Sequence, residues 1–120
     1  FKEAVKKYEN VLANRAARGP LWPRALMGIA AAYEELGDYR TAIPYYQRIY
    51  VMYAGYTNLT PKAYFHSGRC FEKIDDVTAA TNTYAELLAD DTLAHYPETH
   101  LARRRLAQVA PVPAPKEATP

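Results

Sequence analysis

A histidine and a cysteine stand four residues apart near the middle of the sequence, at His66 and Cys70. On a helix this spacing places both side chains on one face, where an imidazole can activate a thiol as a nucleophile. Cys70 also precedes Phe71 in a segment with helical apolar periodicity, and a free cysteine in such a place usually packs as a small hydrophobic side chain. We therefore expect a buried, unreactive Cys70, with the activated thiol as the alternative.

Metal ligands and catalytic motifs are the next candidates. The histidines His66, His95 and His100 do not pair with one another at the i, i+4 spacing of a zinc site, and no cysteine pair accompanies them. Asp75-Asp76 and Asp90-Asp91 lack the alternating acidic loop of a calcium site and are typical of turns and helix caps. The sequence contains no glycine-rich phosphate loop, Gly-x-Ser-x-Gly or His-Glu-x-x-His. It therefore predicts no catalytic residue, no metal and no cofactor, in a protein that is not an enzyme.

The only run of basic residues is Arg103-Arg104-Arg105. Consecutive residues point in different directions around a helix, so these three cannot all face one ligand. We expect the solvated outer face of a capping helix, with contact to phosphate or nucleic acid as the alternative. The net charge of +2 is too small to favour nucleic acid, so we do not expect a nucleic-acid partner.

Length and composition fit one folded domain. The chain has 120 residues, of which 49% are hydrophobic and 23% charged, and this excludes a mostly disordered or collagen-like chain. No run approaches the roughly 18 apolar residues of a membrane span. A single cysteine excludes an internal disulfide framework. Tyrosine is enriched, with 11 residues, and most of these fall on apolar stripes that predict core positions.

The sequence repeats itself with a period of 38 residues. The matched columns include Ala4/Ala42/Ala80, Tyr8/Tyr46/Tyr84, Val11/Ile49/Leu87, Pro23/Pro61, Leu26/Tyr64, Tyr33/Phe71 and Leu36/Ile74. Within each unit the apolar residues recur at three- and four-residue steps, the pattern of an amphipathic helix. Each complete unit therefore predicts two helices, and the two ends of the chain match only one helix each.

These stripes predict helices over residues 2–16, 23–36, 39–54, 61–74, 77–91 and 98–109. Gly37 is expected to end the second helix, Asp38 to cap the third, and Thr60 to cap the fourth, which Pro61 begins. Pro44 lies inside the third predicted helix, where we expect a bend.

Residues 111–120 form a tail that follows a repeat domain over residues 1–110. Four prolines in ten residues exclude helix and sheet, so the tail is predicted to be disordered or extended as polyproline II. We expect it to run along a groove of this or a neighbouring molecule, with an uncontacted tail as the alternative.

The complete unit resembles a tetratricopeptide repeat. The residues that carry this resemblance are Leu26, Ile29, Ala30, Tyr33, Gly37, Ala42, Tyr46 and Ile49, followed in the next unit by Tyr64, Gly68, Phe71, Ala80, Tyr84 and Leu87. The sequence departs from the family pattern at Asp75, where glycine is usual, and at Ala54 and Thr92, where proline is usual. The resemblance implies an all-α, right-handed solenoid of about six helices arranged as helical hairpins.

A narrower resemblance concerns the segment from His95 to Ala107. Tyr96-Pro97 before an alanine- and arginine-rich helix is similar to bacterial cell-envelope repeat proteins, such as outer-membrane-assembly lipoproteins and the Tol-Pal coordinator. This likeness implies the periplasm or cell envelope, with the cytoplasm as the alternative. The sequence begins at Phe1 with no signal-like segment, so we expect any targeting peptide to lie outside it.

The family resemblance also implies a function, which is protein–protein interaction without catalysis. In this family the first helices of successive units line a concave groove that binds a peptide or helix of a partner. The matching positions here are Arg24, Met27, Ala31, Glu34, Glu35, Lys62, Phe65, Arg69, Glu72 and Lys73. They lie opposite or beside the apolar stripes of their helices and combine two apolar anchors with charges of both signs. The alternative is a self-assembly module whose solenoid ends stack on another copy.

Overall fold

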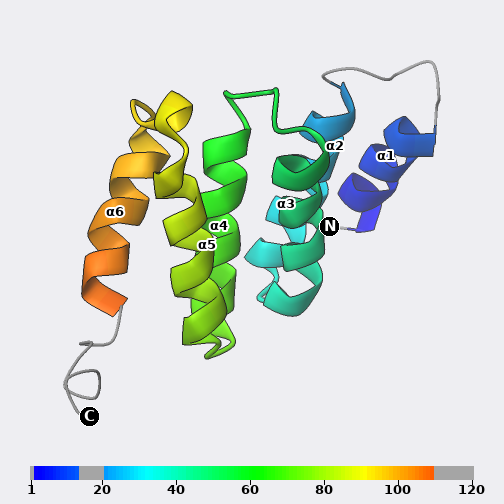
Figure 1. Ribbon diagram of the computed structural model, residues 1–120. Helices are drawn as coiled ribbons and strands as arrows, with labels where there is room; N and C mark the ends of the chain where they lie inside the picture. The colour runs from blue at the N-terminus through cyan, green and yellow to red at the C-terminus, as the bar shows by residue number, and fades with distance from the viewer. Residues whose placement is uncertain (1, 14–20, 110–120) are drawn as a thin grey trace, which may run out of the picture.

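The computed structural model describes residues 2–13 and 21–109 of the chain. These residues form six α-helices and one 3-10 helix and include no strand, which confirms the predicted all-α fold class. The elements are α1 (Lys2–Ala13), α2 (Leu21–Glu35), α3 (Tyr39–Met52), α4 (Thr60–Lys73), α5 (Val77–Ala89), η2 (Asp91–Leu93) and α6 (Pro97–Val109). Each helix packs against the next one along the chain, and α4 also contacts α6. The helices therefore stand side by side, with α1 and α6 at opposite ends (Figure 1).

The two complete hairpins, α2–α3 and α4–α5, turn in the same way. Gly37 has a φ of 81°, and the Asp38 carboxylate then accepts a hydrogen bond from the Thr41 N–H at 3.3 Å. In the second hairpin Asp75 has a φ of 64°, and the Asp76 carboxylate accepts from the Ala79 N–H at 3.1 Å. A left-handed residue followed by an acidic N-cap therefore closes both hairpins, although only the first uses the glycine that this conformation favours.

Several helix boundaries differ from the predicted ones. Helix α2 begins at Leu21, two residues early, and so includes Trp22, while Leu36 lies beyond its end and is 58% exposed. Helix α3 continues through the exposed Pro44, and it ends at Met52 rather than residue 54. Helix α5 ends at Ala89, because Asp90 caps the short 3-10 helix η2. Residues 14–16 of the first predicted helix and the predicted tail lie outside the described residues.

The expected capping role of Thr60 is wrong. Leu59 occupies the N-cap of α4 and offers no side-chain cap, and Pro61 lies in the first turn as expected. Thr60 is instead buried, and its hydroxyl donates to the carbonyl oxygens of Ala54 and Tyr56 at 3.3 and 3.1 Å. The hydroxyl therefore ties α4 to the loop before it, because the loop folds back over the start of the helix.

The core follows the repeated small and aromatic residues of the complete units. Ala42 and Ala80 are fully buried, and Tyr46 and Tyr84 are buried beside them. Ala4, the third member of the alanine column, is exposed, because α1 packs mainly against α2 among the described helices. The alanine column is therefore a core column in the complete units alone.

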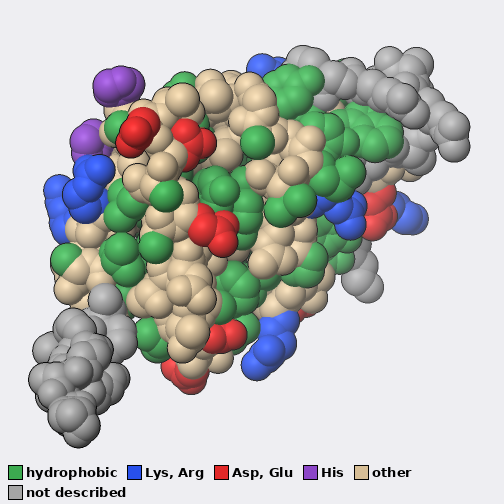
Figure 2. All heavy atoms as spheres, in the orientation of Figure 1, with side chains coloured by type: hydrophobic (Ala, Val, Ile, Leu, Met, Phe, Trp, Pro, Cys, Tyr) green, Lys and Arg blue, Asp and Glu red, His purple; other side chains and the backbone are tan. Residues whose placement is uncertain are grey.

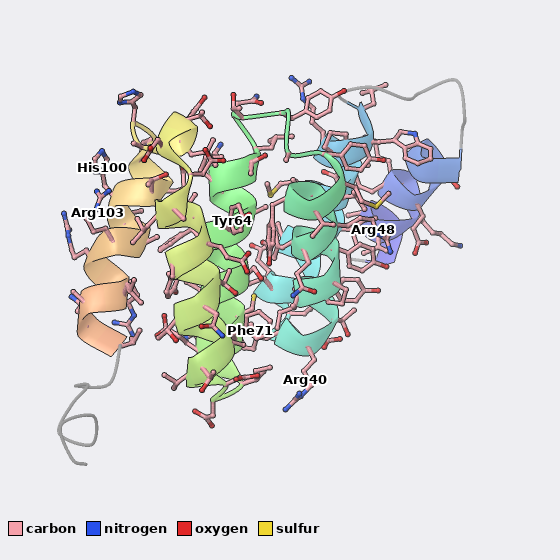
Figure 3. All side chains as sticks on the ribbon, viewed as in Figure 1. Arg40, Arg48, Tyr64, Phe71, His100 and Arg103 are labelled. Carbon is pink, nitrogen blue, oxygen red and sulfur yellow. The ribbon has the colours of Figure 1, made fainter. Side chains whose placement is uncertain are left out.

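Aromatic rings link successive units. Tyr64 and Phe71 of α4 pack against the buried clusters on both sides, one containing Tyr46 and the other Tyr84 (Figure 3). The Tyr64 ring stacks on Tyr50 of α3 with centroids 3.9 Å apart. Such contacts between neighbours supply most of the stability of a linear repeat fold.

Helix α6 is fixed to the preceding units by its first turn. Pro97 begins the helix, the buried Thr99 hydroxyl donates to the Leu93 carbonyl at 2.6 Å, and the Tyr96 hydroxyl donates to Thr57 at 3.0 Å. The Tyr96-Pro97 pair thus lies where α6 begins and contacts the preceding units. Among the described residues, no helix has both the length and the apolar character that crossing a membrane requires.

Candidate functional site

The first helices of the units line two adjoining hollows. One hollow of about 650 Å³ lies between α2 and α4, and a second of about 490 Å³ lies between α4 and α6. Nine of the ten predicted groove residues line them: Met27, Ala31, Glu34, Glu35, Lys62, Phe65, Arg69, Glu72 and Lys73. Arg24 is exposed on α2 and lines neither hollow. Because Arg69 and Lys73 line both, we treat the two hollows as one surface and call it the groove.

The groove is also lined by four residues that the sequence did not indicate as groove residues, namely Tyr39, Tyr46, His66 and Arg105. Tyr46 was predicted as core, and its ring is buried, but its hydroxyl reaches the groove. His66 falls on Gly28 in the 38-residue alignment, and a glycine gives no sign that a side chain belongs there. Arg105 falls on the buried Ser67 and Ile29 in the same alignment, and its arginine run was expected on a solvated outer face. Only the position of α6 turns this arginine toward α4.

Glu34 is the centre of one polar cluster in the groove. Its carboxylate accepts a hydrogen bond from the Tyr46 hydroxyl at 2.7 Å. His66, stacked on the Tyr46 ring, places Nδ1 3.3 Å from the same carboxylate oxygen. Arg69 lies farther away, with 3.8 Å between its guanidinium and the second carboxylate oxygen. The side chain of Glu34 is only 15% exposed, so most of its surface contacts protein groups rather than water.

Glu72 repeats this arrangement one unit later. Tyr84, like Tyr46 in the first unit, donates its hydroxyl to the glutamate twelve residues earlier, here at 2.6 Å. The cation differs, because Arg105 of α6 binds both carboxylate oxygens of Glu72, with its shortest contact at 2.6 Å. Such forked contacts are stronger and more specific than a single long ion pair. Glu72 is therefore held more tightly than Glu34.

These contacts shift the pKa values of both glutamates and of both tyrosines. Burial alone would raise the pKa of Glu34, but the His66 ring, the Tyr46 hydroxyl and the Arg69 charge together hold it below its ordinary value. Burial also opposes ionisation of Glu72, and Arg105 and Tyr84 outweigh it, so that pKa is lowered as well. Burial and the adjacent carboxylates raise the pKa of the Tyr46 and Tyr84 hydroxyls. Both pairs therefore carry an ionised glutamate and a neutral tyrosine that donates to it.

Three of the four exposed cations of the groove lie on α4, and the fourth, Arg105 of α6, is paired with Glu72. Lys62 and Lys73 are exposed and form no ion pair with any described residue. Arg69 is 45% exposed, and its guanidinium carbon lies 5.9 Å from the centre of the Phe65 ring. The groove thus presents an aromatic ring with adjacent exposed positive charges, a combination that can bind carboxylates next to apolar groups.

The opposite side of the hairpins has a different character. A shallower hollow between α3 and α5 includes Gln47, Asn82, Thr83 and Glu86 and no lysine or arginine. In the view of Figure 2, the middle of the face carries mainly apolar and uncharged side chains with some acidic ones, and the basic side chains in view lie toward its edges. The basic residues of this repeat are therefore not evenly spread over its surface.

Cys70 is not an activated thiol. Its side chain is fully buried, and burial, together with the negative charge of Glu34, raises the pKa of the thiol to about 12. His66 turns instead toward Glu34. The prediction of a buried, unreactive cysteine is confirmed, because a thiol with so high a pKa is not a thiolate at neutral pH. Over residues 2–13 and 21–109, no group of three or more histidine, cysteine, aspartate or glutamate side chains is arranged to hold a metal ion.

The three consecutive arginines point in different directions. Arg103 and Arg104 are both exposed, and Arg103, on the outer side of α6, lies 3.3 Å from His100 Nδ1 (Figure 3). Arg105 faces Glu72 in the groove. The predicted solvated outer face thus comprises two of the three residues.

The comparisons with known proteins agree with this architecture. Residues 24–55, which cover α2, α3 and the start of the following loop, match a family model described as a tetratricopeptide repeat. A search of curated proteins found no match, and neither did a search of solved structures. One unit of the chain is therefore similar to a tetratricopeptide repeat, and the stacked helical hairpins agree with that likeness. Such repeats generally mediate protein–protein interaction, and the likeness to bacterial cell-envelope proteins stays a prediction.

Proposed function

We propose that this chain is a non-enzymatic protein-binding module that holds a peptide or helical segment of a partner in the groove. The observation that carries the proposal is the convergence of side chains from α2, α4 and α6 on two adjoining hollows. The groove offers Met27 and Phe65 as apolar anchors beside lysines and arginines that contribute charge. Concave surfaces of this kind are how linear repeat proteins bind extended or helical segments.

Selection of peptides from a random display library on the purified chain tests this proposal. Selected peptides should lose at least about tenfold in affinity when Phe65→Ala and Arg69→Ala are combined, since hot-spot residues carry most of the binding energy. The matched control is Asn82→Ala with Glu86→Ala, a pair of exposed residues beside the opposite hollow. Circular dichroism verifies that both double variants are folded. Equal loss in both variants, or none in the groove variant, would contradict the proposal.

Self-assembly through the solenoid ends is the alternative, and the end helices expose mostly charged side chains together with the apolar Leu101 of α6. On α1 the exposed side chains include Glu3, Lys6 and Lys7, and on α6 they include Arg103 and Arg104. Charged outer faces of this kind keep repeat ends apart in solution. Light scattering over a range of concentrations tests this alternative, for which a constant monomer mass is the expected result.

A further inference from the structure

The acidic side chains of the groove are largely committed to internal partners. Glu34 and Glu72 are each 15% exposed, and each is held by a tyrosine hydroxyl and by cationic or imidazole groups of the next unit. Only Glu35 among the lining carboxylates is exposed. The three glutamates that line the groove therefore contribute less negative charge to its exposed surface than their number suggests.

The basic side chains of the groove are, by contrast, largely uncommitted. Lys62 and Lys73 have no ion-pair partner within residues 2–13 and 21–109. Arg69 makes one ion pair, at the long distance of 3.8 Å, and lies over the Phe65 ring. Arg105 differs from them, because both oxygens of Glu72 neutralise it. Lys62, Arg69 and Lys73 all belong to α4, so the surplus of positive charge is concentrated on the helix that lies between the two hollows.

Phe65, Arg69 and Lys73 follow one another at four-residue steps along α4. Each step advances about 6 Å along the helix axis, so an aromatic ring is followed by two cations on one side of the helix. A second helix with an apolar residue and two acidic residues at the same four-residue spacing has the same rise per step. It can therefore place all three of its side chains opposite these three partners at once.

We infer that the partner segment is an acidic amphipathic helix. Its apolar side chain packs on Phe65, and its two carboxylates pair with Arg69 and Lys73. The inference rests on the proposed function and specifies the chemistry of the partner. The carboxylates belong to side chains within the segment, because two of them are needed four residues apart to pair with Arg69 and Lys73, and a chain terminus supplies only one backbone carboxylate.

Three labelled peptides with amidated C-termini test the inference by fluorescence anisotropy. The first is helix-forming, with Leu, Glu and Glu at four-residue spacing; the second replaces each Glu by Lys; the third is a scrambled peptide of the first composition. The first should bind at least about tenfold tighter than the second, because like charges repel across an interface. It should also bind more tightly than the third, and added salt should weaken its binding.

Charge reversals at exposed positions provide a second test with little risk to folding. Lys73→Glu should weaken binding of the acidic peptide at least about tenfold, and Glu35→Lys should strengthen it severalfold. The matched control is Arg103→Glu, which changes the net charge as Lys73→Glu does, at an exposed residue on the outer side of α6 (Figure 3). It should leave the affinity within about twofold of the original, because screening removes most interaction beyond about 10 Å.

The outcomes separate this inference from the proposed function. If the basic or the scrambled peptide binds as tightly as the acidic one, and Phe65→Ala with Arg69→Ala still abolishes binding, the acidic helix is wrong and the groove stands. If a single-stranded oligonucleotide of the same charge competes equally well, the groove is a general anion surface, and the inference is overturned. If Lys73→Glu and Arg103→Glu have equal effects, the groove is not where the peptide binds, and both proposals fall.

Discussion

The two complete units build the same glutamate–tyrosine pair and then differ in what the next helix adds. In the unit α2–α3, Glu34 accepts from Tyr46, and the next unit offers a stacked histidine and an arginine 3.8 Å away. In the unit α4–α5, Glu72 accepts from Tyr84, and α6 offers an arginine that binds both oxygens. The contact within a unit repeats with the sequence period, while the contact between units depends on which side chain the next helix presents.

This difference shows how one motif can have two roles. Arg105 of α6, the last described helix, forms an ion pair with Glu72 at that end of the groove. Between the units, Arg69 is as exposed as Arg105 but lies 3.8 Å from Glu34 and makes no contact with both carboxylate oxygens. The position of a unit within the array therefore decides whether its neighbouring arginine serves stability or stays available to a ligand.

The largest expected effect comes from overpacking the alanine column. Ala42→Leu and Ala80→Leu should each lower the free energy of unfolding by about 1–3 kcal/mol, because both sites are fully buried and well packed. Ala4→Leu, at the exposed member of the column, should change it by less than about 0.5 kcal/mol. Urea midpoints measure all three. A loss at Ala4 equal to that at Ala42 would mean that α1 is packed differently.

Removing the tyrosine hydroxyls tests the comparison of the two pairs directly. Tyr46→Phe should destabilise the protein by about 1–2 kcal/mol, since it leaves Glu34 with only the more distant His66 and Arg69. Tyr84→Phe should cost about 0.5–1 kcal/mol, because Glu72 keeps both contacts to Arg105. Tyr45→Phe, which preserves the stacking of Tyr45 on Tyr33, is the control for removal of a hydroxyl. A larger loss for Tyr84→Phe would reverse the ranking of the two pairs.

Acid should weaken both pairs. The folded-state pKa values of Glu34 and Glu72 lie below the ordinary value of about 4.5, so their contribution to stability is present above that pH. It is lost as the pH falls through the lowered values, because the unfolded chain binds the proton first. The urea concentration at the unfolding midpoint should therefore decrease as the pH is lowered from about 6 to 3.

Glu34→Gln and Glu72→Gln isolate these contributions to the pH dependence. Each variant should be less stable than the original chain at neutral pH, and the difference should shrink as the pH is lowered, because glutamine does not titrate. A difference that stays constant down to pH 3 would show that the glutamate charge does not contribute. Urea titrations at three pH values supply the measurement.

The smallest effect is expected at the hairpin turns. Asp75 adopts a φ of 64°, a conformation that glycine adopts with less strain, so Asp75→Gly should stabilise the protein by up to about 1 kcal/mol. Gly37→Asp makes the reverse change at a φ of 81° and should destabilise by a similar amount. Matched thermal melts of the two variants should shift in opposite directions. Shifts in the same direction would indicate that the two turns are not equivalent.

Most of the fold could be predicted from the repeat. The 38-residue period located the helices to within two or three residues wherever the structure describes their ends, and it placed Ala42, Tyr46, Ala80 and Tyr84 in the core. Nine of the residues that line the groove are among the ten positions that the family resemblance implied. Whether these residues bind a partner stays a prediction.

The errors occurred where the neighbouring element, rather than the local pattern, decides the environment. Ala4 continues a core column but is exposed, since no described helix covers that side of α1. Thr60 has the identity of a cap but points into the preceding loop. Leu36 continues an apolar stripe one residue past the end of its helix and is exposed.

The sequence by itself determined the helices, the repeat and the residues on each helical face, because helical periodicity is a local property of the chain. Only the tertiary structure decided which charged groups meet. Arg69 and Arg105 are both exposed arginines on first helices, yet one lies beside Phe65 with a long contact to Glu34, and the other is bound to Glu72. That outcome depends on distances of a few ångströms between helices separated by more than 30 residues, and ion pairs are sensitive to such distances because their energy falls as the charges separate.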